Sequence, residues 1–137
     1  MFLPEARILI IDDASSMRQF MRKLLDGLGF KNLLEVSNGA EGLRNIEGAM
    51  VDKKVFDLVL CDWSMPGKTG LDVLKAVRGG ALTKNTPFIM VHGDADKKII
   101  DSAVACGASS FFIKPLTGPN LKKKIEEAWA KHHKVAA

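Results

Sequence analysis

Short apolar runs recur along this chain, and each is followed by a segment in which apolar residues have the spacing of a helix. The runs are continuous rather than alternating, which is typical of strands that are covered on both faces. Strands that alternate with helices throughout a chain predict a parallel sheet with right-handed crossovers and helices on both faces. The runs place the expected strands at residues 7–11, 33–37, 57–61, 88–91 and 110–113.

The segments between the runs carry helix signals. In the first, Ser15 or Ser16 can cap the start and Gly29 closes the end, while Asn38-Gly39 leads into the second. Further helices are expected after the Met65-Pro66-Gly67 turn, over 97–106 and over 120–132. The residues expected on inward faces are Met17, Phe20, Met21, Leu24, Leu28, Leu43, Ile46, Met50, Leu71, Leu74, Val77, Leu121, Ile125, Ala128 and Trp129.

Three of the apolar runs end in charged residues. The first ends in Asp12-Asp13, the third in Asp62, and the fifth in Lys114-Pro115. In a doubly wound sheet the functional crevice lies beyond the carboxyl ends of the strands, so we expect these side chains to meet there. Crowded carboxylates repel one another, and such a site favours a divalent cation, with the lysine offsetting further charge. This pattern predicts a phosphoryl-transfer site.

Composition narrows the class of protein. A chain of 137 residues suits one domain, and 47% hydrophobic with 26% charged residues argues against disorder or a membrane span. The N-terminal residues lack the long apolar stretch of a signal peptide. Cys61 and Cys106 are too few for a disulfide framework, which favours a reducing cytoplasm. The net charge of +4 comes largely from 122–124 and 132–134, which we interpret as a solvated helix face and tail rather than a nucleic-acid surface.

Four segments together resemble the response-regulator receiver domain: Ile8 to Phe30, the Asp62-Trp63-Ser64-Met65-Pro66 motif, Gly70-Leu71-Asp72, and Gly107 through Lys114-Pro115. The resemblance covers nearly the whole chain. It implies a receiver domain over residues 5–134 without an output domain, with a flavodoxin-like doubly wound (βα)5 fold and strand order 2-1-3-4-5. Within the family the chain is most similar to stand-alone chemotaxis receivers, through Asp62-Trp63 and Ser16-Met17-Arg18.

The resemblance also implies a role for each site residue. Asp62 would be the phosphoacceptor, a carboxylate nucleophile. Asp13, Asp62 and the backbone carbonyl of Ser64 would bind Mg²⁺ directly, and Asp12 would reach it through water. Lys114 would contact a phosphoryl oxygen, and the Lys114-Pro115 peptide bond is expected to be cis. No enzyme activity is implied beyond slow phosphorylation from small donors and slow loss of the phosphoryl group.

The chain departs from the family at the position after the fourth strand, where Ser or Thr is usual and His92 stands, followed by Gly93. The imidazole can replace the hydroxyl as a donor to phosphate, block ordinary switching, or point to solvent without a special role. The family's aromatic switch falls at Phe111, whose neighbour Phe112 competes with it for the interior. Ser64 and Asp94 occupy positions that govern water access to the phosphoryl group, and Asp94 can alternatively cap the fourth helix.

The leading interpretation is a cytoplasmic receiver that takes a phosphoryl group from a histidine kinase and then changes its affinity for a downstream protein. That protein could be a flagellar motor switch or a phosphotransfer protein. We expect neither nucleic acid nor a membrane to be a partner of this chain. The alternative is an adaptor whose partner binding does not depend on phosphate, as His92 suggests. A haloacid-dehalogenase-type phosphatase is less consistent, because Ser64 stands where that family needs a second Asp. Flavin binding would lack a phosphate loop after the first strand, and the acidic pair there would repel the flavin phosphate.

Overall fold

The computed structural model describes residues 4–93 and 96–132, which form five strands and five helices in strict alternation. In chain order they are β1 (Arg7–Ile11), α1 (Ser15–Gly27), β2 (Asn32–Val36), α2 (Gly39–Val51), β3 (Leu58–Asp62), α3 (Gly70–Gly79), β4 (Phe88–His92), α4 (Lys97–Ala105), β5 (Ser110–Ile113) and α5 (Gly118–His132). No helix in this part of the chain combines the length and apolar character needed to cross a bilayer.

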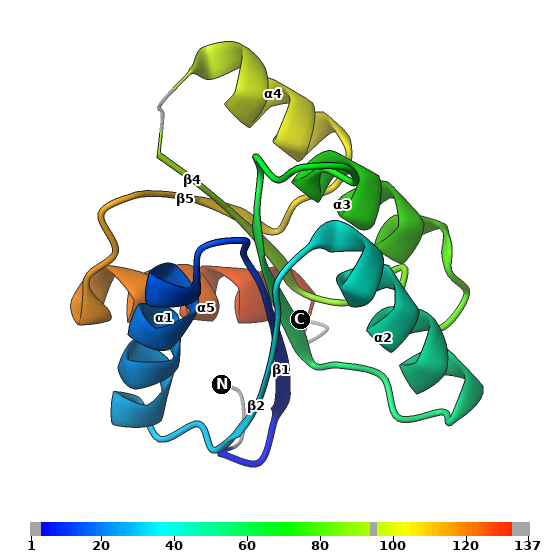
Figure 1. Ribbon diagram of the computed structural model, residues 1–137, viewed down its shortest axis with the longest axis horizontal. Coiled ribbons are helices and arrows are strands. Elements are labelled where there is room, and N and C mark those ends of the chain that lie inside the picture. Colours follow the sequence, from blue (N-terminus) through cyan, green and yellow to red (C-terminus); the bar gives the residue numbers. More distant parts are fainter. Residues whose placement is uncertain (1–3, 94–95, 133–137) are drawn as a thin grey trace, which may run out of the picture.

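The strands form one parallel sheet in the order β2-β1-β3-β4-β5, which confirms the predicted fold. Figure 1 shows α1 and α5 on one side of the sheet, with α2 and α3 on the other. The register sets Ile11 beside Cys61, and Asp62 beside Val91. The carboxyl ends of β1, β3 and β4 therefore lie next to one another.

Alternate strand residues supply two cores. The first packs under α1 and α5 and contains Ile8, Ile10, Leu60, Val91 and Phe112 together with Met21, Leu25, Leu121, Ile125 and Ala128. The second packs under the remaining helices and contains Leu9, Ile11, Val59, Phe88 and Met90 together with Ile46, Val73, Leu74, Val77 and Ala103. Burial on both faces explains why the strands have continuous apolar runs.

Several expected boundaries differ from the structure. The N-cap of α1 is Ala14, without a side-chain cap, so the predicted capping by Ser15 or Ser16 is wrong. The Asp12 carboxylate accepts the Ala14 N–H at 2.9 Å, and the helix starts earlier than a serine cap requires. Strand β2 begins and ends one residue earlier than expected, whereas β3 and β4 each extend one residue further, to Asp62 and His92. Phe20 is 41% exposed, because one helix face cannot bury residues across its whole width.

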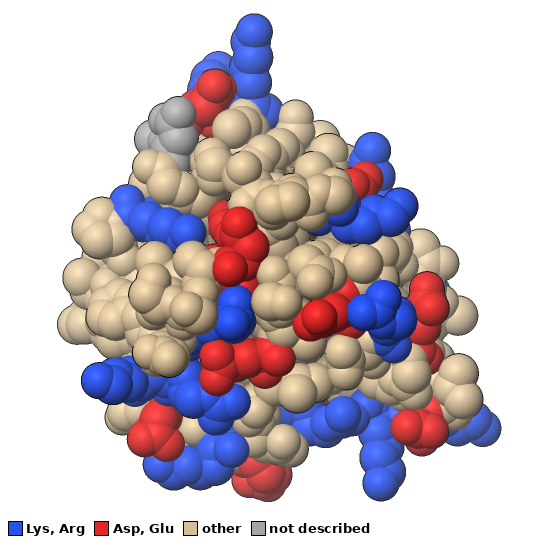
Figure 2. Space-filling model, in the orientation of Figure 1, with Lys and Arg blue, Asp and Glu red and all other residues tan. Residues whose placement is uncertain are grey.

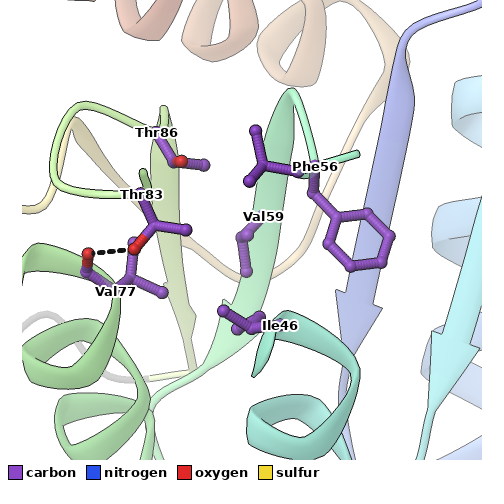
Figure 3. Close-up of a pocket in the computed structure, with 7 residues that line it drawn as sticks. Ile46, Phe56, Val59, Val77, Thr83 and Thr86 are labelled. Atoms are coloured by element: carbon purple, nitrogen blue, oxygen red, sulfur yellow. Dashed lines mark hydrogen bonds between the residues drawn. The ribbon is translucent and has the colours of Figure 1, made fainter. Parts of the chain in front are cut away.

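Arg78 from α3 ties together the segments that lead into β4 and β5. Its guanidinium donates hydrogen bonds to the carbonyls of Gly107, Lys84 and Thr86 and to Ser109 Oγ, at 2.6 to 3.2 Å. Burial lowers the pKa of Arg78. A cavity of about 10 Å³ lies nearby, lined by Ile46, Val55, Phe56, Val59, Val77, Thr83 and Thr86 (Figure 3). The Thr83 hydroxyl donates to the Val77 carbonyl at 2.6 Å, so this cavity has no free polar group at Thr83.

Candidate functional site

Asp12 and Asp13 follow the last residue of β1 and lie in different environments. Asp12 is fully buried, whereas Asp13 is exposed. The backbone carbonyl of Asp12 accepts a hydrogen bond from Arg18 at 2.7 Å, and Arg18 in turn lies 3.7 Å from Glu35 of β2. Arg22 forms a second ion pair with Glu35. Two residues of α1 and one of β2 thus hold the backbone that carries the acidic pair.

Asp62 is the last residue of β3 and is 6% exposed. Its Oδ1 accepts the Ser64 N–H at 3.4 Å, and Trp63 follows it at the rim of the site. The loop turns back closely, because Gly70 donates its N–H to the Trp63 carbonyl at 3.0 Å. A Cβ at Gly70 would lie 2.9 Å from Trp63 Cα and 2.8 Å from Met90 Sδ, and would also overlap the Asp62 carbonyl. Only glycine permits this approach of α3 to the end of β3.

Lys114 brings the cation predicted for the site. Its Nζ lies 3.6 Å from Asp12 Oδ2 and 3.8 Å from Asp62 Oδ2. Its backbone N–H donates to the His92 carbonyl at 2.8 Å, which continues the ladder between β4 and β5 beyond the last strand pair. The Lys114-Pro115 bond is cis, as expected.

The carboxylates at this edge are crowded. Asp12, Asp13 and Asp62 each offer an oxygen within 4.8 Å of the others. The pKa of Asp62 is raised, first by burial and then by the Asp12 charge, while Lys114 and the Ser64 N–H act in the opposite direction. Burial and the same two aspartates also raise the pKa of the Cys61 thiol, so this cysteine is not an activated nucleophile.

One atom of the site lacks a hydrogen-bond partner. Asp12 Oδ2 is buried and accepts no hydrogen bond from the described residues, since the Lys114 ammonium at 3.6 Å lies just beyond hydrogen-bonding distance. Buried carboxylate oxygens are normally satisfied, so this atom indicates room for a further ligand. Three converging carboxylates are the donor set that a hard divalent cation such as Mg²⁺ prefers, and the residues present therefore fit that ion.

The surface around the site is mixed in charge. Figure 2 shows lysine and arginine side chains spread over the visible face, with acidic side chains among them and near its centre. The visible face therefore lacks the single basic stripe that is typical of nucleic-acid binding.

The two expected switch residues lie beside this site on β4 and β5. His92 ends β4 and is half-buried, and no side-chain hydrogen bond of His92 occurs within the described part of the chain. Phe111 is half-buried against the second core, whereas Phe112 is buried in the first, so Phe112 is the phenylalanine that faces fully inward. Asp94 lies outside the described residues, and the cap of α4 is Asp96, whose carboxylate accepts the Lys98 N–H at 2.8 Å.

Three supporting residues were assigned no role at the site from the sequence, although Arg18 is part of the Ser16-Met17-Arg18 motif. Arg18, Arg22 and Glu35 form a network that reaches the Asp12 backbone. A signal existed: Arg18 and Arg22 are four residues apart on one helix, and Glu35 interrupts an otherwise apolar strand. A charge inside a strand run requires a partner, and an i,i+4 arginine pair on a neighbouring helix can supply it.

Comparison with known proteins agrees with this geometry. A family model of the response regulator receiver domain matches residues 8–126. The chain is 40% identical over 121 residues to the chemotaxis protein CheY of Pseudomonas aeruginosa, covering 88% of this chain and 94% of that protein. It is 37% identical to chemotaxis protein CheY-3 of Vibrio cholerae, covering 88% and 89% of the two chains.

Solved structures show the same similarity. Chemotaxis protein CheY4 of Vibrio cholerae superposes with a TM-score of 0.80 at 28% identity, covering 90% of this chain and 98% of that one. A putative response regulator from Chloroflexus aurantiacus gives a TM-score of 0.82 at 26% identity, covering 92% and 98%. The similarity extends over the site as well as the sheet, and this chain belongs to the response regulator receiver domain family.

Proposed function

We propose that this protein is a cytoplasmic receiver of a two-component system, which accepts a phosphoryl group on Asp62 from a histidine kinase. The observation that carries the proposal is the convergence of Asp12, Asp13, Asp62 and Lys114 at one sheet edge in a chain of this family. The protein acts as a phosphoacceptor rather than as an enzyme with a separate substrate. The receiver domain occupies residues 5–134.

The transfer follows from the positions of these side chains. A carboxylate oxygen of Asp62 forms a bond to phosphorus while the phosphorus–nitrogen bond of the donor phosphohistidine breaks, and the imidazole leaves with the bonding electron pair. Lys114 contacts a phosphoryl oxygen and offsets its charge. Asp13, Asp62 and the Ser64 carbonyl would hold Mg²⁺, with Asp12 reaching it through water, and the ion would supply further charge compensation for the transferring group. Ser64 is small and exposed, which leaves the phosphoryl group open to water.

The output of this receiver is a change in affinity for another protein. The surface proposed for that partner is formed by α4, β5 and α5, where Val104 and Ile113 are 61% and 39% exposed. The relatives are chemotaxis proteins by name, which favours control of a flagellar motor switch as the output. The other possible output is delivery of the phosphoryl group to a phosphotransfer protein in a relay.

Acetyl phosphate with Mg²⁺, followed by intact-mass measurement, tests the phosphoacceptor. The native protein should gain one phosphoryl mass, and Asp62→Asn should gain none. Asp101→Asn, which removes an exposed carboxylate on α4, serves as the matched control and should be modified like the native protein. Modification that persists in Asp62→Asn, or that never occurs in the native protein, would contradict the proposal.

Trp63 provides a separate test of the metal site. Because it follows Asp62 directly, its indole should sense a cation bound among the carboxylates. In a Trp129→Phe background, Mg²⁺ titration should change Trp63 emission, and Asp13→Asn should weaken the apparent affinity about tenfold or more. A flat titration would argue against a divalent cation here.

A second candidate function rests on His92. His92 ends β4, is half-buried, and makes no side-chain hydrogen bond in the described structure. The family usually has a Ser or Thr here, whose hydroxyl forms a hydrogen bond to the phosphoryl group. If His92 blocks switching, the protein is an adaptor whose partner contact is independent of phosphate. If His92 donates to the phosphoryl group, protonation of the imidazole strengthens the switch.

His92→Thr separates these two functions. The measurement is the amide chemical-shift response of α4 to beryllofluoride with Mg²⁺, in native and variant protein, at mildly acidic and mildly basic pH. A blocked adaptor responds only after His92→Thr, whereas a histidine switch responds in the native protein and loses its pH dependence in the variant. An identical response of both proteins at each pH would show that His92 has no special role.

A further inference from the structure

A groove separates the second half of α1 from the start of α5, on the side of the sheet that lacks His92 and Phe111. It is open to solvent, has a volume of about 530 Å³, and is lined by Leu24, Gly27 and Leu28 of α1, Gly118 and Pro119 of α5, and Lys23 and Lys122 at its sides. None of these residues belongs to the phosphoryl-transfer site, and the proposal below goes beyond the function proposed above.

The groove exists because both helices carry glycine along it. A Cβ at Gly27 would meet no heavy atom within 4 Å, and a Cβ at Gly118 would meet only Leu24 Cδ2, at 3.9 Å. Leu24 and Leu28 pack part of their surface against the first core and leave the rest accessible. Since Pro119 has no backbone N–H, the floor of the groove is almost entirely carbon.

The sides of the groove are positive. Lys23 and Lys122 are exposed and come from different helices, and neither has an acidic partner within the described residues. The nearest acid along α1, Asp26, is paired with Lys31 at 2.7 Å. The N-terminus of α5 adds partial positive charge at the same end.

Charge also selects among possible occupants. A second copy of this groove would bring four like-charged lysines together, so self-association through it is disfavoured. An amphipathic helix with apolar anchors on one face and carboxylates beside them matches both the carbon floor and the lysines. We propose that the α1/α5 groove docks an acidic amphipathic helix of a partner protein, independently of phosphorylation at Asp62.

Independence from Asp62 follows from the position of the groove. Helix α1 begins beside the acidic pair and runs away from it, so Gly27 and Leu28 lie at the end of α1 that is remote from the site. The α1 and α5 helices pack on the first core, whereas His92 and Phe111 lie toward the second. Docking there leaves the proposed switch surface open for a second protein.

The test uses the full chain, labelled with ¹⁵N, and a synthetic helical peptide with leucines at i, i+4 and i+7 flanked by glutamates. Saturable amide shifts should occur at Leu24, Leu28, Gly118 and Lys122, and a peptide with lysine in place of every glutamate should give none. Gly27→Met should fill the groove without strain, because the space is open and the glycine φ is not positive, and should weaken binding at least tenfold. Lys23→Glu combined with Lys122→Glu should weaken it to a similar degree.

Matched controls exist on α3. Gly79→Met places the same side chain at another open helix-terminal glycine, and Lys75→Glu reverses an exposed lysine on the same helix; both variants should bind like the native protein. Three results would overturn the proposal: absence of saturable shifts, equal binding of the basic peptide, and binding unchanged by Gly27→Met. Binding that required acetyl phosphate and Mg²⁺ would assign the groove to the phosphorylation switch instead, and dimerisation lost in Gly27→Met would identify a second copy as its occupant.

Discussion

The two ends of the sheet differ in how their charged side chains are partnered. At the amino end, Arg78 donates to three carbonyls and one hydroxyl, and its charge is fully engaged. At the carboxyl end, Asp12 is completely buried with an ion pair at 3.6 Å, but its Oδ2 has no hydrogen-bond partner within the described residues. The first arrangement stabilises the fold, whereas the second leaves coordination capacity for something that binds. The stabilising contacts of Arg78 and the proposed binding site at Asp12 thus lie at opposite ends of the strands.

The largest expected effect is at the amino end. Arg78→Met keeps much of the carbon stem but leaves four acceptors without their donor, so the free energy of unfolding should fall by about 3 kcal/mol. Urea denaturation measures this loss. Phosphorylation of Asp62 in the folded variant should stay unchanged. Lys75→Met on the same helix is the control and should change stability by less than about 0.5 kcal/mol. A loss below 1 kcal/mol for Arg78→Met would remove the contrast between the two ends.

The next effect concerns the close approach behind Asp62. Gly70→Ala forces a methyl group against the Asp62 carbonyl, Trp63 and Met90, and should cost about 2 kcal/mol of unfolding free energy. It should also weaken Mg²⁺ binding, because the end of β3 must move. Gly79→Ala, at the open end of the same helix, should be neutral or stabilising by up to about 1 kcal/mol. Equal behaviour of the two variants would show that the loop adapts freely.

An effect of opposite sign is expected at the carboxyl end. Without Mg²⁺ at neutral pH, Asp62→Asn removes one of the crowded charges and should raise the free energy of unfolding by about 1.5 kcal/mol. Burial and the Asp12 charge raise the pKa of Asp62 in the folded protein. Between the unfolded and the folded pKa, Asp62 therefore keeps a proton in the folded protein but has lost it in the unfolded chain. The stability linked to that proton is fully present below the unfolded pKa of about 3.9 and is lost as pH rises through the raised folded value.

The advantage of Asp62→Asn should therefore shrink as pH falls, and should disappear in acid. Denaturation of both proteins across the acidic range, in chelator, measures the difference directly. Added Mg²⁺ should reverse the order of stability at neutral pH, since only the native protein keeps the full set of carboxylates. An advantage that is constant with pH would mean that Asp62 ionisation does not oppose folding.

The smallest effect is expected at the cavity of about 10 Å³. This space is smaller than a methyl group needs, so Val59→Ile should overfill it slightly and cost about 1 kcal/mol or less. The same change at Val51, which is 81% exposed, should have no measurable effect. A clear stabilisation by Val59→Ile would show that the amino end is packed less tightly than the Arg78 network suggests.

Much of this molecule could be predicted from local sequence signals. The parallel sheet was predicted from the continuous apolar runs. The convergence of Asp12, Asp13, Asp62 and Lys114 was predicted because the carboxyl ends of parallel strands lie at one edge of a sheet. The start of α2 directly after Asn38 and the closing Gly29, with φ of +98°, also agree with expectation. These features depend on residues close in sequence or on topology alone.

The features that were missed depend on side-chain geometry between elements. The contacts of Arg18 and Arg22 with Glu35 require the orientation of α1 over β2, which periodicity does not supply. The exposure of Phe20 depends on how wide a face α5 and the sheet can cover. The start of α1 was misplaced because Ala14, which has no capping side chain, is the N-cap, and its own N–H donates to Asp12.

The hydrogen bond from Arg18 to the Asp12 carbonyl has a consequence for how the site assembles. Asp12, Asp13, Arg18 and Glu35 all belong to the β1-α1-β2 unit, so half of the site and the contacts that hold its backbone are encoded within 24 consecutive residues. Asp62 and Lys114 come from distant parts of the chain and join only through long-range strand pairing. The repulsion that involves Asp62 therefore arises only when β3 docks beside β1. The Lys114 ammonium that offsets it also arrives through long-range strand pairing.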